Sequence, residues 1–300
     1  MSPTRSGDQA SAAAAQPIDC IHADCLNALP KLIHAFSTRA GGFSQAYGSG
    51  QLNLGFTASD TRAAVERNRR AFILAVSGEA QSLPLVTLRQ IHSGLVRILK
   101  SGDRVPEVPV KGDGVITTRR GILLGVQVAD CVPVLVADRS TAAVGAFHAG
   151  WRGTVKRIVE RGVGSMRAAF GCRPDDLYAA IGPCIHACCY AVGDQVIDEV
   201  TSQFTYAEEL FSEVYDRDPV KEKYPLLFLT ARAPGHSNIG PQIHFDLVEA
   251  NRRQLLDAGL REDHIWTAEQ CTSCRTDLLF SHRAEAGYTG RMMGVIGFLK

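Results

Sequence analysis

Three apolar, β-branched runs follow one another with almost no chain between them, and this spacing limits the fold more than any other feature. The runs cover residues 122–128, 132–136 and 143–147. Parallel neighbours need a crossover connection of a dozen or more residues, which these gaps cannot hold. Part of the sheet is therefore predicted to be antiparallel. This indicates an α+β chain with a mixed sheet rather than a doubly wound parallel one.

The rest of the chain supplies further strands, helices and one irregular stretch. β-Branched runs predict strands at 85–88, 96–99 and 114–117. Apolar spacing predicts helices at 61–74, capped by Asp60 or Thr61, at 154–170 and at 247–258. Four prolines make 201–242 look like an irregular excursion. With no internal repeat, we predict one domain over 18–300 after a disordered lead-in over 1–17.

Charge and cysteine content narrow the class of partner and the compartment. The 32 Lys and Arg residues balance 31 Asp and Glu residues, so the net charge is +1 and no global field holds nucleic acid or a membrane. No apolar run approaches the ~20 residues of a spanning helix. The nine cysteines, an odd number without a compact framework, favour free thiols in a reducing compartment. We expect a cytoplasmic protein with no nucleic-acid or membrane partner.

Three residues that can bind a metal follow or end apolar runs. They are His92 after the 85–88 run, Cys131 between two apolar runs, and His148 at the end of a third. Strand ends at one sheet edge converge, so these side chains could meet. Two imidazoles and a thiolate are a normal ligand set for catalytic zinc, which keeps a fourth position open. The alternative is that each is a hydrogen-bonded or buried core residue.

Two glycine-containing turns are candidates for binding an anion. Arg152 lies in the Gly150–Gly153 turn before the predicted helix at Thr154, where free N–H groups favour anions. Arg39 lies beside a glycine pair in a second such turn. Asp130 could orient a ligating histidine, contact substrate or pair with an arginine. The alternative for both turns is an ordinary turn with a solvated arginine.

The remaining cysteines leave two hypotheses open. Cys184 and Cys188 could join Cys271 and Cys274 in a structural zinc site, and Cys271–Cys274 has the spacing of a redox pair. We favour small buried thiols instead, and the role of Cys189 stays open. The chain has no P-loop, dinucleotide-binding glycine motif or serine-hydrolase elbow.

Eleven short segments together resemble one known family. They are TRAGGFS at 38–44, LNLG at 52–55, ERNR at 66–69, QIHS at 90–93, GDGVIT at 112–117, ADCVPV at 129–134, HAGWRGT at 148–154, IGPCI at 181–185, CYAVG at 189–193, CT at 271–272 and TGRM at 289–292. Their order is similar to that of the laccase-domain or polyphenol oxidase family, also called the peptidoglycan editing factor or purine nucleoside phosphorylase family. The sequence departs from this pattern at Ala284, where a second Arg is common, and in the longer 201–242 stretch.

The resemblance implies a fold, a metal site and an activity. It implies a single-domain α/β sandwich with flanking helices, and zinc on His92, Cys131 and His148. It also implies zinc-dependent phosphorolysis of adenosine, inosine, guanosine and methylthioadenosine, with adenosine deamination. The expected contacts with nucleoside and phosphate are Arg39, Asn53, Gln90, Asp130 and Arg152. We expect a monomer or weak homodimer.

Other functions remain open at this point. Copper and polyphenol oxidation are less favoured, because nine scattered histidines include no H-x-H pair. A Cys/His hydrolase that edits a peptidoglycan precursor would use Cys131 as nucleophile and His148 as base, leaving His92 without a role. A zinc-stabilised binding protein without turnover is the third alternative.

Overall fold

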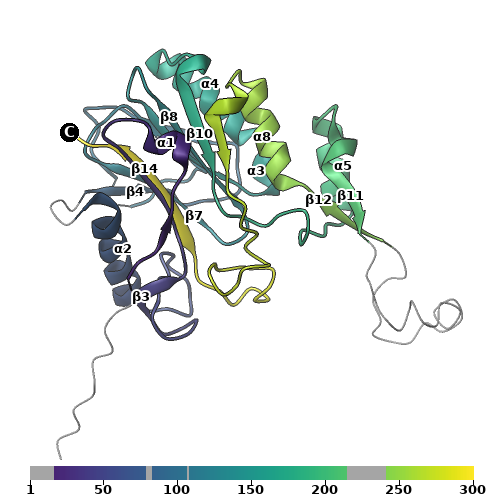
Figure 1. Ribbon diagram of the computed structural model, residues 1–300, viewed down its shortest axis with the longest axis horizontal. Coiled ribbons are helices and arrows are strands. Elements are labelled where there is room, and N and C mark those ends of the chain that lie inside the picture. Colours follow the sequence, from purple (N-terminus) through teal and green to yellow (C-terminus); the bar gives the residue numbers. More distant parts are fainter. Residues whose placement is uncertain (1–16, 79–82, 107, 215–240) are drawn as a thin grey trace, which may run out of the picture.

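The computed structural model describes residues 17–78, 83–106, 108–214 and 241–300. Two β-sheets stack face to face and helices cover their outer faces, which gives four layers (Figure 1). This is the mixed-sheet α/β sandwich with flanking helices that the sequence predicts. Residues 1–16, most of the predicted lead-in, lie outside the described residues.

The first sheet has five strands in the order β1-β2-β14-β7-β4. Its strands are β1 (Cys20–Ile21), β2 (Leu32–Ser37), β14 (Met292–Phe298), β7 (Leu123–Val128) and β4 (Leu85–Thr87). All neighbours are antiparallel except β4 and β7, which are parallel. The chain's last strand therefore lies at the centre of this sheet, between strands from its first half.

The second sheet has six strands in the order β13-β10-β8-β9-β6-β5. They are β13 (Ile265–Thr267), β10 (Leu177–Ile181), β8 (Val132–Asp138), β9 (Val144–Ala149), β6 (Gly114–Thr117) and β5 (Val96–Leu99). The two edge pairs are parallel and the central pairs antiparallel. The closely spaced β8 and β9 form the predicted antiparallel pair.

The central strands are apolar throughout because both of their faces are buried. In β8, Val132, Val134 and Val136 pack towards the helices, while Leu135 and Ala137 pack in the core between the sheets. This is the alternation of a β-strand with an apolar layer on each side. A continuous apolar run in the sequence thus marks a strand in the middle of the sandwich.

Helices cover the two outer faces. The outer face of the first sheet packs on α2 (Arg62–Ser77), and β3 (Ala40–Ser44) lies beside this helix. The second sheet packs on α4 (Ile158–Phe170) and α8 (Leu247–Asp257) (Figure 1). Thr61 caps α2 by accepting a hydrogen bond from the Ala64 N–H, as its sequence predicts.

Smaller elements complete the described chain. They are the short helices α1 (Asp24–Asn27) and α3 (Trp151–Val155), the longer α5 (Asp194–Gln203), the antiparallel strands β11 (Phe211–Val214) and β12 (Gln242–Phe245), and three 3-10 turns, η1 (Pro174–Asp176), η2 (Ala207–Leu210) and η3 (Glu262–His264).

The structure corrects the predicted helix at 154–170. A first helix, α3, begins already at Trp151 and ends at Val155. A second helix, α4, then begins at Ile158. Arg157 at the break has a φ of 56°, in the left-handed region. The carbonyl of Thr154 accepts hydrogen bonds from the Arg157 N–H and from the side chain of Gln254 on α8. The break in the helix thus coincides with a buried polar contact to α8, although the apolar pattern continues through it.

The predicted irregular excursion is partly regular. Its beginning belongs to α5, and its ends form the antiparallel pair β11 and β12. The part from 215 to 240, with three of its prolines, lies outside the described residues. Across the described residues, no helix has the length and apolar character needed to cross a membrane.

Candidate metal centre

The three predicted ligand side chains lie together. The ligand atoms of His92, Cys131 and His148 are all within 4.8 Å of one another. Cys131 Sγ is 3.8 Å from His92 Nε2. The imidazole rings of His92 and His148 lie edge to face, with their centroids 4.9 Å apart. This is a compact set of two nitrogen donors and one sulfur donor.

Two of these residues lie where the chain passes between the sheets. His92 follows β4 of the first sheet and precedes β5 of the second. Cys131 lies between β7 of the first sheet and β8 of the second, while His148 is on β9. The short gap between the 122–128 and 132–136 runs is thus a change of sheet and not a hairpin.

Asp113 organises two of the three ligands. Its carboxylate accepts hydrogen bonds from the backbone N–H groups of Ile91, His92 and Ser93, and from the Ser93 hydroxyl. His148 Nδ1 lies 2.9 Å from Asp113 Oδ1. Because a carboxylate only accepts, His148 donates from Nδ1, and its Nε2 remains available for a metal.

The protonation of this group follows from its contacts. Burial disfavours ionisation of Asp113, but His148 and Ser93 outweigh it and hold the pKa of the carboxyl well below its usual range. Burial likewise opposes ionisation of the Cys131 thiol, yet His148 and His92 lower its pKa to about 6. Burial favours neutral His148, but Cys131 and Asp113 raise its pKa to about 9. The thiolate, the form that binds metal, is therefore accessible at neutral pH.

Gly150 makes room for the ligands. A Cβ at this position would lie 2.8 Å from Cys131 Sγ and 3.0 Å from His92 Cδ2. Its φ of −71° is open to any residue, so the requirement for glycine comes from these neighbours and not from the backbone. The glycine in the predicted anion turn is thus a packing element of the ligand cluster.

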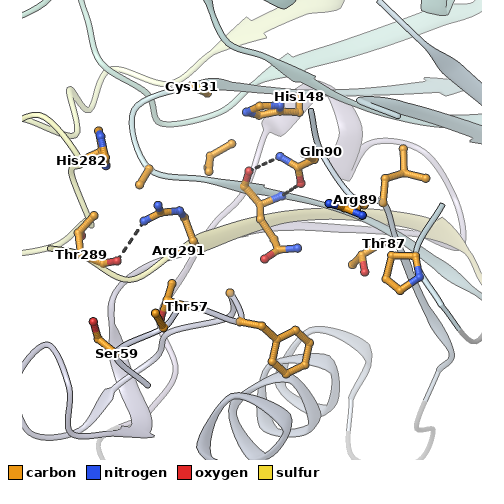
Figure 2. A pocket seen from close by; sticks show the side chains of 18 of the residues that line it. Thr57, Ser59, Thr87, Arg89, Gln90, Cys131, His148, His282, Thr289 and Arg291 are labelled. Atoms are coloured by element: carbon orange, nitrogen blue, oxygen red, sulfur yellow. Dashed lines mark hydrogen bonds between the residues drawn. The ribbon is translucent and has the colours of Figure 1, made fainter. Parts of the chain in front are cut away.

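The ligand cluster lies in the wall of a cleft of about 820 Å³. Around it, Figure 2 shows His282 and Arg291 on one side and Arg89 on the other. Arg69 from α2 also lines the cleft, and among the described lining residues none is Asp or Glu. A nearly neutral protein therefore has a cleft lined by positive and neutral groups.

Gln90 is the one predicted substrate contact that lines the cleft. Its side-chain Nε2 donates to the Gln127 carbonyl, and its Oε1 accepts from the Gln127 N–H (Figure 2). Both ends of the amide are therefore used to hold β7 beside the loop that carries His92. Its role as a substrate contact stays a prediction.

The other four predicted contacts are engaged elsewhere and do not line the cleft. Arg39 pairs with Glu285 at 3.1 Å, and Asn53 is fully buried and donates to Asp60. Arg152 is exposed and stacks on its neighbour Trp151. Arg39 and Asn53 are thus engaged within the scaffold. The role of these four residues as substrate contacts stays a prediction.

Asp130 does not contact a histidine. Its carboxylate accepts hydrogen bonds from the hydroxyls of Thr272 and Ser281 and from the Arg283 N–H. Its backbone has a φ of 85°, in the left-handed region, directly before Cys131. The orienting role that the sequence suggested for Asp130 is filled by Asp113.

Sequence reasoning missed Asp113 and the cationic cleft residues Arg89, Arg291 and His282. Asp113 stands between two glycines in a quoted segment, and an acid in such a segment is a signal for a buried acceptor. Arg291 belongs to the TGRM segment and Arg89 precedes QIHS. The only sequence signal for these residues was their position in or beside the family segments. Their closeness in space could not be seen, because the cleft joins distant parts of the chain.

The donor chemistry fits a zinc ion. Imidazole nitrogen and thiolate sulfur are the ligands that zinc prefers, and three protein ligands leave a fourth position open. The His148–Asp113 contact fixes the tautomer that presents Nε2, as in many metal sites. The residues could therefore hold a catalytic metal. A multicopper centre would require more histidines than this cluster contains.

Comparison with known proteins places the chain in a family. Residues 33–299 match the family model described as multi-copper polyphenol oxidoreductase laccase. The chain belongs to this family, as its eleven segments predict. The family's description concerns copper, whereas the names of similar proteins concern nucleosides.

Several curated relatives carry such names. The chain is 35% identical to "Purine nucleoside phosphorylase YlmD" of Geobacillus stearothermophilus over 88% of this chain and 89% of the relative. It is 36% identical to a purine nucleoside phosphorylase of Deinococcus radiodurans over 88% of each chain. "Adenosine deaminase RL5" of an unknown prokaryote is 32% identical over 69% of this chain and 72% of the relative.

The fold has solved counterparts. The crystal structure of YlmD from Geobacillus stearothermophilus superimposes with a TM-score of 0.75 at 32% identity, covering 96% of this chain and 98% of that one. The Bacillus licheniformis protein YfiH gives a TM-score of 0.74 at 31% identity, covering 90% and 93%. The sandwich is thus shared with these structures.

Proposed function

We propose that this protein is a zinc-dependent purine nucleoside phosphorylase. The observation that carries the proposal is the convergence of His92, Cys131 and His148 at a cleft without acidic lining residues in the described chain. The names of the relatives support the substrate class, a purine nucleoside with phosphate. Adenosine, inosine, guanosine and methylthioadenosine are the proposed nucleosides, and the cytoplasm is the proposed location.

The cationic side chains would bind phosphate. Arg89, Arg291 and His282 face the cleft from two sides (Figure 2), and Arg291 is held in place by the carbonyls of Thr289 and Gly290. Guanidinium groups bind phosphate oxygens with two parallel hydrogen bonds. With phosphate held there, one of its oxygens attacks C1′ of the ribose, the bond to the purine breaks, and the base leaves with that electron pair.

Aromatic side chains near the cleft mouth would hold the base. Phe56 and Tyr288 line the cleft and are 49% and 58% exposed. Aromatic rings stack on nucleobases, and each such stack contributes about 1–3 kcal/mol to binding. Zinc, when bound by the three ligands, would supply Lewis acidity towards a substrate oxygen.

Adenosine turnover with and without phosphate tests the proposal, on protein whose zinc content is known. Release of adenine and ribose-1-phosphate only when phosphate is present is the expected result. Arg89→Gln should raise the phosphate KM about tenfold or more, because a charged hydrogen bond is lost. Arg70→Gln, at an exposed neighbour of Arg69 on α2, is the matched control and should leave it unchanged. A rise for Arg152→Gln instead would move the phosphate site to the α3 turn.

A second candidate function rests on the closeness of Cys131 and His148, whose ligand atoms lie within 4.8 Å of each other. Cys131, with a pKa near 6 beside His148, has the properties of a nucleophile with its base, as a hydrolase acting on a peptidoglycan precursor requires. His92→Ala separates the two functions. It should abolish phosphorolysis by removing a zinc ligand, whereas a hydrolase that needs only Cys131 and His148 would keep much of its activity. Inosine formed from adenosine without phosphate would reveal the deamination that one relative's name suggests.

A further inference from the structure

A second cluster of thiols lies outside the cleft. The Sγ atoms of Cys188, Cys189, Cys271 and Cys274 are all within 4.8 Å of one another. None of the four residues lines the cleft. The sequence hypothesis of a four-cysteine site used Cys184, but that residue is fully buried in the apolar core beneath the helices. The structure replaces it with Cys189.

Two backbone turns bring these thiols together. In the first, the His186 carbonyl accepts hydrogen bonds from the N–H groups of Cys189 and Tyr190. In the second, the Cys271 carbonyl accepts from the Arg275 N–H. A parallel bridge between Cys184 and Cys271 sets the two turns side by side. The chain thus builds a paired-turn scaffold from segments more than eighty residues apart.

Three of the six distances between the sulfur atoms are close to those of a tetrahedral ion site, and the distances to Cys271 Sγ are within 4.8 Å. Cys189 and Cys274 are 3.3 Å apart, Cys188 and Cys274 are 3.6 Å apart, and Cys188 and Cys189 are 3.7 Å apart. A tetrahedron with zinc–sulfur bonds of about 2.3 Å has edges of about 3.8 Å. A disulfide needs a sulfur–sulfur distance near 2.05 Å, and these three pairs are well beyond it.

One thiol already has the hydrogen bond of a thiolate ligand. The His186 N–H donates to Cys271 Sγ at 3.4 Å. Backbone N–H groups pointing at sulfur stabilise the negative charge that four thiolates place around a metal. Cys188 and Cys274 are exposed, so an ion can reach the cluster from solvent.

We propose that Cys188, Cys189, Cys271 and Cys274 form a tetrathiolate zinc site that joins the 186–190 turn to the 271–275 turn. Four sulfur donors close the coordination shell, so the site is structural and has no open position for substrate. Each thiol loses its proton to solvent when the ion binds.

The site would also support the metal centre in the cleft. Thr272, inside the second turn, donates to Asp130 Oδ1, and the Ile185 N–H donates to the Asp130 carbonyl. Asp130 directly precedes Cys131. The second turn and the residue that directly precedes the first turn therefore both contact the neighbour of Cys131.

Zinc content per chain, measured by elemental analysis on reduced full-length protein, tests the proposal. Wild-type protein should hold one zinc at each of the two sites. The double variant Cys188→Ser/Cys274→Ser should lose one zinc and melt about 5 °C lower or more. Cys131→Ser should lose the other zinc. Cys20→Ser, at a free thiol outside both clusters, is the control and should lose neither.

Cobalt substitution provides a readout that does not need the double variant to fold. Cys131→Ser loaded with Co²⁺ should show the intense thiolate charge-transfer absorption of a tetrahedral four-sulfur site. Absence of that absorption, together with four thiols that react freely with a thiol reagent, would overturn the proposal. Disulfides among the four in freshly prepared protein, or iron in place of zinc, would overturn it as well.

Discussion

At the scale of single residues, Asp113 has the widest influence on the candidate metal centre. It is fully buried, and its carboxylate accepts hydrogen bonds from the backbone N–H of His92 and from the ring of His148. His92 has a φ of 56°, which is uncommon for a residue with a side chain. The hydrogen bonds to Asp113 compensate for this conformation and fix where the His92 ring points.

Asp113→Asn should weaken metal binding. The new amide group would place N–H donors against the N–H groups of the His92 loop and would no longer hold His148 in one tautomer. We expect zinc affinity to fall about 10- to 100-fold, and the free energy of unfolding to fall by about 2 kcal/mol. Competition with a chelator and urea unfolding measure the two effects. Asp103→Asn, at an exposed acid, is the control; an equal loss there would contradict the role of Asp113.

Residue types and the family resemblance together predicted the candidate ligands but not their surroundings. His92, Cys131 and His148 could be named because few side chains bind zinc and each stands beside an apolar run. Asp130 was the expected partner because it adjoins Cys131, yet its carboxylate turns away to Thr272 and Ser281. Which neighbour a carboxylate meets depends on tertiary contacts, and no local pattern in the sequence encodes them.

At the scale of elements, the short helix α3 and the end of β9 form one wall of the ligand cluster. Gly150 joins them as the N-cap of α3. The predicted anion turn is therefore helical, and its arginine lies on the outside. The six strands predicted between residues 85 and 147 agree with β4 to β9 to within two residues at each end, whereas β2, β10 and the fully buried β14 were not predicted. The break between α3 and α4 was not predicted, because the apolar spacing continues through it and the contact found there, from Gln254 of α8 to the Thr154 carbonyl, is distant in the sequence.

Gly150→Ala should expel the metal while keeping the fold. The added methyl group would lie against Cys131 Sγ and His92 Cδ2, so the ligands must separate. We expect zinc content to fall well below that of wild-type protein with unchanged circular dichroism. Gly164→Ala in α4 is the matched control, because nothing lies within 4 Å of its Cβ. It should keep the zinc and gain about 0.5–1 kcal/mol of stability from helix propensity. Full zinc in Gly150→Ala would contradict the packing role of this glycine.

At the scale of the whole molecule, one buried histidine couples the stability of the sandwich to pH. His34 on β2 accepts a hydrogen bond at Nε2 from the Ala23 N–H at 2.8 Å. Burial and the nearby His22 lower the pKa of His34 to about 4. The folded protein thus keeps this ring neutral at a pH where the unfolded chain protonates it.

Stability should therefore fall as the pH drops from about 6.5 towards 4, since the unfolded state binds the proton first. Between about pH 7.5 and 5 the loss from His34 alone is about 2 kcal/mol. Urea unfolding of wild type and His34→Gln at both pH values measures it, because glutamine keeps an acceptor but does not titrate. Equal pH dependence in the two proteins would show that His34 does not contribute.

The positions of the ligands at the sheet crossings also bear on how the molecule is assembled. His92 and Cys131 are 39 residues apart and leave different strands of the first sheet. Neither sheet, folded alone, contains the whole set of donors. The ion can be captured only once the two sheets have docked, so no early intermediate has the complete binding site. A chain that holds the metal in this cleft has thus completed its long-range folding.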